Sequence, residues 1–124
     1  MNIELISISK NTEVNAIKVF DFTPNFFLKL SKSDFSQIGD SVTKQLVVEG
    51  EIVDMKLVEM SQFIRDTIIR FLEKMYVDLS FESFEKLGSS PSKEEFQEYT
   101  CDLKELNQLI IYLRETEYTH LKRV

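Results

Sequence analysis

The chain has few of the residues on which recognisable chemistry depends. Its 124 residues include one cysteine, one histidine, three glycines, two prolines and no tryptophan. The single cysteine, Cys101, excludes a disulfide within the chain and, with no signal peptide at the N-terminus, favours a reducing cytoplasm. Three scattered glycines form no phosphate-binding loop. The longest apolar runs are far shorter than the roughly 20 residues that span a membrane. We therefore expect a protein of the cytoplasm.

Excess positive charge is also lacking, since 21 acids outnumber 15 bases and the formal net charge is −6. Nucleic-acid binding and docking on anionic membranes both depend on clustered Lys and Arg. We therefore expect neither nucleic acid nor membrane as a partner. Residues 76–105 carry eight acids and three bases, whereas residues 1–75 are close to balanced. This imbalance favours a protein partner with a basic surface.

Candidate catalytic and metal-binding residues are weak. Glu117 and His120 have the Glu-x-x-His spacing of di-iron bundles, but those proteins need the motif twice and this chain has one histidine. We expect His120 in the last turn of a C-terminal helix, where positive charge is favoured. Nineteen residues of one helix would separate it from Cys101 by about 28 Å, so Cys101 is expected to be an inert, buried or half-buried thiol. The sequence predicts a protein that is not an enzyme, with no catalytic residue, metal or cofactor.

The N-terminal part is predicted to begin with strands. A hydrophobic content of 43% and a charged content of 29% fit one globular domain over residues 1–124. Residues 3–22 have the pattern of a β-hairpin. Thr23 and Pro24 then have the residue types of a helix cap and a first helical residue. Ser33 offers a second cap, and the steps of three and four residues that follow it favour another helix.

Residues 44–56 leave two interpretations open. Glu49 and Gly50 could form the turn of a hairpin between β-branched residues. Alternatively, Gly50 could end one helix before the next begins. We favour the helical interpretation because the spacing of three and four residues continues beyond it.

Two long helices are predicted for the rest of the chain, over about 55–77 and 92–118, joined by a linker over 78–91. Ser92 and Glu95 match a capping box at the start of the second helix. The expected fold class is α+β, with an N-terminal antiparallel β-hairpin packed against a helical layer dominated by these two antiparallel helices. An all-α domain with a β appendage is the alternative.

The second long helix carries an apolar stripe and an acidic stripe. The apolar stripe is expected to be core, and it comprises Phe96, Tyr99, Leu103, Leu106, Ile110 and Leu113. The alternative is a dimer seam or a groove for a partner, since Leu109 and Tyr112 lie off the main line and could face outward. The acidic stripe comprises Glu94, Glu98, Asp102 and Glu105. Like charges at this spacing repel, and the helix dipole compensates only those in the first turn. Asp102 and Glu105 are thus left without a structural reason.

These four acidic residues are the predicted partner-binding residues, although a solvated helix face is the alternative explanation. The predicted function is that of a small acidic protein that binds and neutralises another macromolecule, as bacterial immunity proteins and phage-encoded inhibitors do. The alternative is a structural or assembly component, such as a phage or secretion-system accessory, that acts by self-association. A monomer and a homodimer are both compatible with the sequence.

Overall fold

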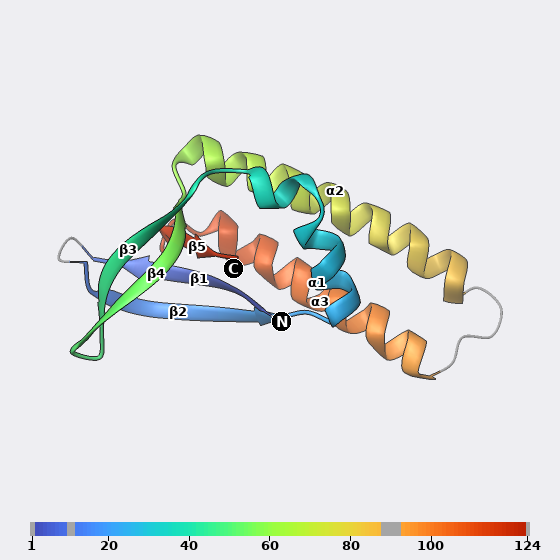
Figure 1. Cartoon of the computed structure of the whole chain (residues 1–124). Helices are drawn as coiled ribbons and strands as arrows, with labels where there is room; N and C mark the ends of the chain where they lie inside the picture. The colour runs from blue at the N-terminus through green and yellow to red at the C-terminus, as the bar shows by residue number, and fades with distance from the viewer. Residues whose placement is uncertain (1, 10–11, 88–92, 124) are drawn as a thin grey trace.

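The computed structural model describes residues 2–9, 12–87 and 93–123, with backbone alone at residues 84, 86, 87, 93, 95, 96, 98 and 99. Over these residues the chain is an α+β fold in which a helical pair covers an antiparallel sheet (Figure 1). The elements are β1 (Asn2–Ile8), β2 (Val14–Asp21), α1 (Pro24–Ser31), the 3₁₀ turn η1 (Asp34–Gln37), β3 (Ser41–Val48), β4 (Glu51–Glu59), α2 (Gln62–Leu87), α3 (Lys93–Arg114) and β5 (His120–Lys122).

The sheet has the strand order β2-β1-β5-β4-β3, and every neighbouring pair is antiparallel. The β1–β2 hairpin confirms the prediction for residues 3–22. The predicted last helical turn at His120 is wrong, because residues 120–122 form β5. This short strand pairs with both β1 and β4, so that it joins two hairpins into one sheet.

The β3–β4 hairpin replaces the predicted helix over this part of the chain. Glu49 and Gly50 have φ angles of 52° and 83°, and a type I′ hairpin turn needs two such positive values. The helical interpretation of residues 44–56 is therefore wrong. That interpretation depended on the spacing of Val42 and Leu46. Residues four apart lie on one face of a helix, but they also lie on one face of a strand.

The segment between the hairpins follows the predicted caps but not the predicted second helix. The Thr23 side chain accepts from the backbone N–H of Phe26, and Pro24 begins α1, as expected. The Ser33 side chain caps only the short turn η1. Gly39 then has a φ of 72°, and a Cβ there would lie 2.6 Å from Cγ1 of Val58. This close approach to β4 requires glycine.

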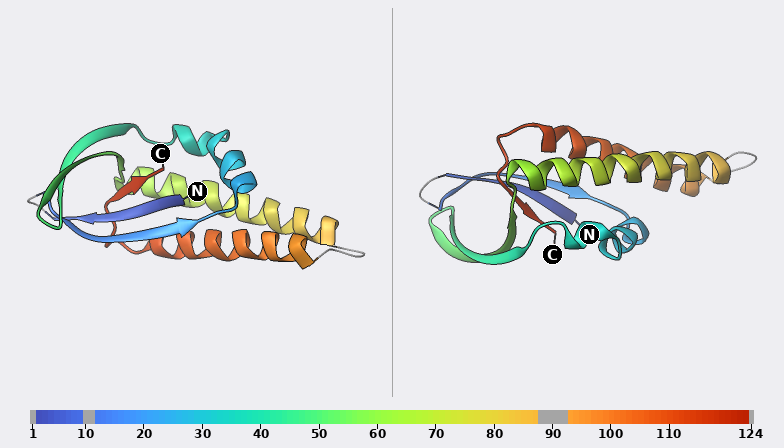
Figure 2. Two further views of the ribbon diagram at one scale, coloured as in Figure 1. Left: turned by 60° about the horizontal axis from the view of Figure 1, so that its bottom comes forward. Right: turned by 90° about the horizontal axis from the view of Figure 1, so that it is seen from above.

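The two long helices are confirmed as an antiparallel pair, but their bounds differ from those predicted. α2 begins at residue 62 rather than 55 and continues to 87, through most of the expected linker. α3 ends at residue 114 rather than 118. Ser92, and with it the predicted capping box, lies outside the described residues. Figure 2 shows the pair lying against one face of the sheet at one end and projecting beyond the sheet at the other.

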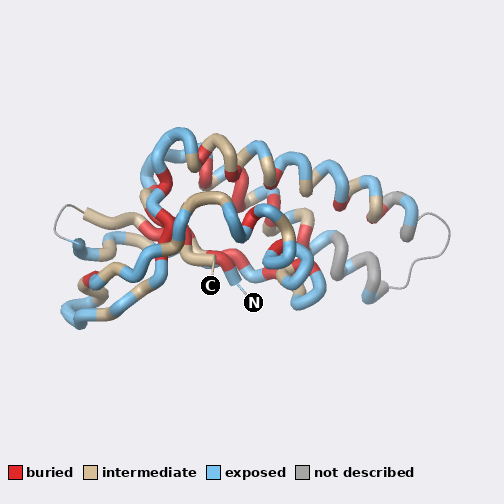
Figure 3. The backbone as a smooth tube through the Cα atoms, turned by 45° about the horizontal axis from the view of Figure 1, so that its top comes forward, coloured by how far each residue is buried: buried red, intermediate tan, exposed pale blue. Residues whose placement is uncertain are grey.

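The main core lies between the sheet and the near half of the helical pair, where buried positions concentrate (Figure 3). Leu106, Ile110 and Leu113 are buried there, as expected of the apolar stripe. Leu109 is fully buried, and the Tyr112 ring packs 5.8 Å from that of Phe20 on β2. Both residues therefore face the core, since α3 contacts both α2 and β2, and the alternative in which they face outward is wrong.

Arg65 ties the first turns of α2 to the C-terminal end of α3. Its Nη1 donates to the carbonyls of Leu113 and Glu115 at 2.8 and 3.0 Å, and its Nη2 donates to the carbonyl of Tyr118. The Arg65 side chain is buried. It satisfies carbonyls that the end of a helix leaves without partners, and it fixes the chain that leads into β5.

Candidate functional site

The four acidic residues predicted to bind a partner do not form one exposed surface. Glu94 is exposed and Glu105 is half-buried. For Glu98 the structure describes the backbone alone. Asp102 is only 4% exposed. The stripe therefore contains at least one residue that a partner protein cannot reach.

Asp102 has a structural role that its sequence neighbourhood does not reveal. Its Oδ1 accepts from the backbone N–H of Thr23 at 2.9 Å, and its Oδ2 accepts from the Thr23 hydroxyl at 2.6 Å. The Thr23 oxygen in turn accepts from the N–H of Phe26 at 3.4 Å. The carboxylate thus fixes the cap of α1 against α3. Thr23 and Asp102 are 79 residues apart in the sequence, and no local pattern connects them.

A different surface combines acidic charge with exposed apolar side chains. On α2, Val77 and Phe81 are 50% and 68% exposed. They lie one turn apart, so they share a helix face with Glu85, one turn further on. Asp78 and Glu85 are both exposed. We call these four residues, together with Glu94 at the start of α3, the distal surface. It lies at the end of the helical pair that projects beyond the sheet (Figure 1).

The sequence does not predict the distal surface, because residues 78–91 have the composition of a linker. The available signal was the position of Phe81 among three acids in the eight residues 78–85, which is a poor composition for a core helix. Nearer the sheet, α2 exposes Arg70 and Lys74 instead. Glu73 lies between them and is paired with Arg114 at 3.1 Å, so this segment of α2 is mixed in charge, whereas Asp78 and Glu85 are both acidic.

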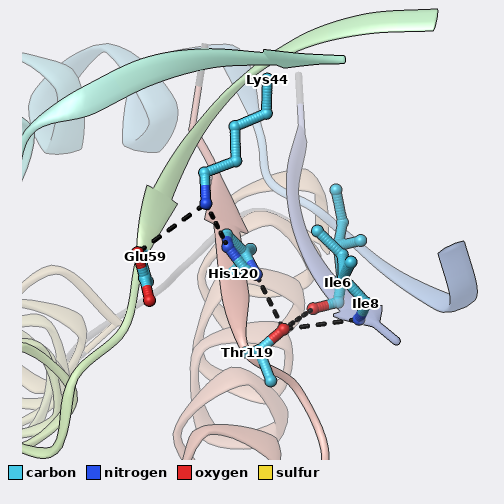
Figure 4. A network of polar contacts seen from close by, with 6 residues as sticks. All are labelled: Ile6, Ile8, Lys44, Glu59, Thr119 and His120. Carbon is cyan, nitrogen blue, oxygen red and sulfur yellow. Dashed lines mark hydrogen bonds and ion pairs between the residues drawn. The ribbon is translucent and has the colours of Figure 1, made fainter. Parts of the chain in front are cut away.

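A cluster of polar side chains surrounds His120, a buried residue at the start of β5 (Figure 4). Its Nε2 lies 3.2 Å from Nζ of Lys44 on β3, and that ammonium lies 3.7 Å from Oε2 of Glu59 on β4. Its Nδ1 lies 2.7 Å from the Thr119 hydroxyl, which contacts the backbone of Ile6 and Ile8 on β1. The cluster links four strands on the sheet face opposite the helical pair.

The contacts determine which proton His120 carries. Because the Lys44 ammonium can only donate, Nε2 accepts and Nδ1–H donates to Thr119. Burial lowers the pKa of His120, the Lys44 charge lowers it further, and Glu59 opposes them. The imidazole is therefore neutral near pH 7. The described polar contacts of the cluster therefore link β5 to β1, β3 and β4, and a structural role accounts for them.

Other chemistry has little support in the structure. Cys101 is exposed on α3, so its predicted burial is wrong. Among the described residues, no three His, Cys, Asp or Glu side chains converge as a metal site would need. No helix in the described ranges is long and apolar enough to cross a membrane. Comparison with known proteins found no matching family model, no matching curated protein and no matching solved structure.

Proposed function

We propose that this protein is a non-enzymatic binding protein that captures a basic partner protein, and thereby neutralises it, through the distal surface. The single observation that carries the proposal is the exposure of Phe81, at 68%, between acidic residues on a projecting helix. A side chain of this size and exposure is typical of the anchor of an interface, because aromatic residues contribute much of the binding energy.

The acidic neighbours indicate the chemistry of the partner. Asp78 and Glu85 flank Phe81 on α2 and are exposed. Such charges accelerate the encounter with a basic surface and disfavour partners of like charge. Glu82, which lies between them, forms an ion pair with Lys29 of α1 at 3.2 Å, so it also fixes the helix to the rest of the domain.

Self-association through the same surface is the competing function. In a symmetric dimer the same patch meets itself. The carboxylates of Asp78 and Glu85 would then face the acidic patch of the second copy, which is electrostatically unfavourable. A basic protein partner fits the surface better than a second copy does.

The proposal predicts that the partner, once captured from the native host and purified, will lose affinity when the distal charges are reversed. The variant carries Asp78→Lys, Glu85→Lys and Glu94→Lys. We expect its Kd to rise by at least about tenfold at low salt, and the difference to shrink as salt screens the charges. Titration calorimetry across a range of salt concentrations measures both effects.

The matched control reverses three exposed acids elsewhere, Glu51→Lys, Glu115→Lys and Glu117→Lys, so that the net charge changes by the same amount. Its Kd should stay close to that of the unmodified protein. Equal losses in both variants would show that net charge, rather than the distal surface, governs binding. Light scattering of the unmodified protein provides a second test, because a concentration-dependent dimer abolished by Phe81→Ala would favour self-association instead.

A further inference from the structure

A cavity unrelated to the distal surface lies beside the sheet, at the end where β1 begins. Its volume is about 420 Å³, within the range of roughly 300–1,000 Å³ in which proteins hold small molecules. One part of its lining is apolar and the other is polar or positively charged. The residues that line it are Ile3, Phe27, Leu30, Ser31, Phe35, Ser36, Ser41, Lys56 and Arg123.

The apolar part comes from three separate elements. Ile3 is on β1, Leu30 on α1 and Phe35 on the turn η1, and all three belong to the main core. Leu30 and Phe35 are almost completely buried. These side chains are held by their neighbours on both sides, so the cavity wall is pre-formed and needs little rearrangement to receive an apolar group.

The positive charge comes from Arg123 and Lys56, and none of the described residues that line the cavity is acidic. The Nη1 of Arg123 donates to the carbonyls of Phe35 and Ile38, both at 2.6 Å, and its Nη2 donates to that of Gly39 at 2.7 Å. A guanidinium has five N–H groups. Two of them, on Nε and Nη2, have no partner among the described residues.

The environment of Arg123 favours a negatively charged ligand. Burial lowers the pKa of the guanidinium, and the charge of the exposed Asp40 only partly opposes this effect. The three bound carbonyls are neutral and hold the group in place without cancelling its charge. A pre-positioned guanidinium of this kind binds a carboxylate more strongly than a mobile one does.

Lys56 and Ser41 complete the polar side. Val58 is the cross-strand neighbour of Ser41, and Lys56 precedes it by two residues on β4. Lys56 and Ser41 therefore lie diagonally across one face of the β3–β4 hairpin, within reach of a common ligand. Neither the Lys56 ammonium nor the Ser41 hydroxyl has a hydrogen-bond partner in the part of the chain that the structure describes.

We propose that this cavity binds a small amphipathic carboxylate, with its apolar body against the half-buried Phe27 and the wall behind it formed by Leu30 and Phe35, and its carboxylate between Arg123 and Lys56. The net charge of the chain is −6, yet the described polar lining of the cavity carries two positive side chains and no acidic one. This lining favours an anion, and the apolar wall favours a hydrophobic body. Neutral and cationic molecules of the same shape lack the charge-assisted hydrogen bonds.

Decanoate is a suitable probe, with decanol and decylamine as its neutral and cationic counterparts. Titration calorimetry of the full chain should show one saturable site for decanoate, with a Kd at least about tenfold lower than for decanol. Lys56→Gln should raise the Kd for decanoate several-fold and leave the Kd for decanol unchanged. The matched control is Lys74→Gln, an exposed lysine of α2 away from the cavity, which should change neither.

The position of the ligand is tested by filling the cavity. Ser41→Trp places a bulky residue that strands accept well at the cavity lining, and it should abolish saturable decanoate binding while the circular dichroism spectrum is retained. Binding that survives Ser41→Trp, or equal affinities for decanoate and decylamine, would overturn the proposal. These outcomes are independent of the partner protein, because none of the altered residues belongs to the distal surface.

Discussion

The half of the helical pair that lies on the sheet differs from the half that projects beyond it. In the near half, Leu72 and Leu109 are fully buried, and Arg65 satisfies carbonyls at the end of α3. In the projecting half, Val77 and Phe81 are exposed among acidic residues. Leu79 and Ser83 are nevertheless buried there, so the projecting half adds a free surface only on the outward face of α2. This contrast predicts that substitutions will separate stability from binding according to their position along the pair.

The largest expected effect is that of shortening a buried leucine in the near half. Leu72→Ala should lower the free energy of unfolding by about 2–5 kcal/mol, because it leaves a cavity in a close-packed core. Phe81→Ala removes a larger side chain from the same helix, yet we expect a change within about 0.5 kcal/mol, since the residue is exposed. Urea denaturation measures both. A loss of several kcal/mol for Phe81→Ala would place that side chain in the core.

Removal of Arg65 should have the next largest effect. Arg65→Ala leaves three carbonyls without their donor, which should lower the free energy of unfolding by about 2–3 kcal/mol. Arg70, on the same helix and exposed, provides the control, and Arg70→Ala should change stability by less than about 0.5 kcal/mol. Similar values for the two arginines in chemical denaturation would contradict the role given to Arg65.

The acidic stripe itself contains a sharper contrast. Asp102→Ala should lower the free energy of unfolding by about 1–3 kcal/mol, because the N–H of Thr23 loses its acceptor. Glu94→Ala should leave stability nearly unchanged. Thermal unfolding followed by circular dichroism separates the two, and a stable Asp102→Ala variant would show that the cap of α1 does not depend on this carboxylate.

The smallest expected effect is a dependence of stability on pH through His120. Its pKa is lowered in the folded protein by burial and by Lys44, against the opposing charge of Glu59. As the pH falls, the unfolded chain therefore takes up a proton on His120 before the folded protein does. The contribution of neutral His120 to the free energy of unfolding is complete above about pH 6.5, and it is lost as the pH falls through the lower pKa of the folded protein.

His120→Gln removes this titration. We expect the unmodified protein to lose more stability than His120→Gln between about pH 7 and pH 5.5. The measurement is urea denaturation of both proteins at each pH. Parallel losses would mean that other groups account for the dependence.

Local patterns in the sequence predicted the local features of the fold. The β1–β2 hairpin, the cap at Thr23 and the existence of two long helices all follow from turn residues, cap residues and periodicity within short segments. β3 was misread because Val42 and Leu46 fit a helix and a strand equally. β5 was missed because a strand of three residues is defined by the edges of β1 and β4 that it joins, which no local pattern contains.

The candidate site shows the same limit. The composition of the sequence shows that residues 76–105 are rich in acids, but it does not show which of these acids are buried. Asp102 binds Thr23, a contact across 79 residues, whereas Glu94 is exposed on the same helix. Phe81 can be assigned to the surface only because α2 continues to residue 87, through most of the expected linker.

The most direct test measures stability and partner affinity on the single variant Phe81→Ala, with Phe63→Ala as its control at the opposite end of α2. Phe63 is 76% exposed, so the two substitutions remove the same exposed group. We expect Phe81→Ala to keep its free energy of unfolding and to raise the Kd for the captured partner by at least about tenfold. Phe63→Ala should change neither. Unchanged partner affinity in Phe81→Ala would contradict the assignment of binding to the distal surface.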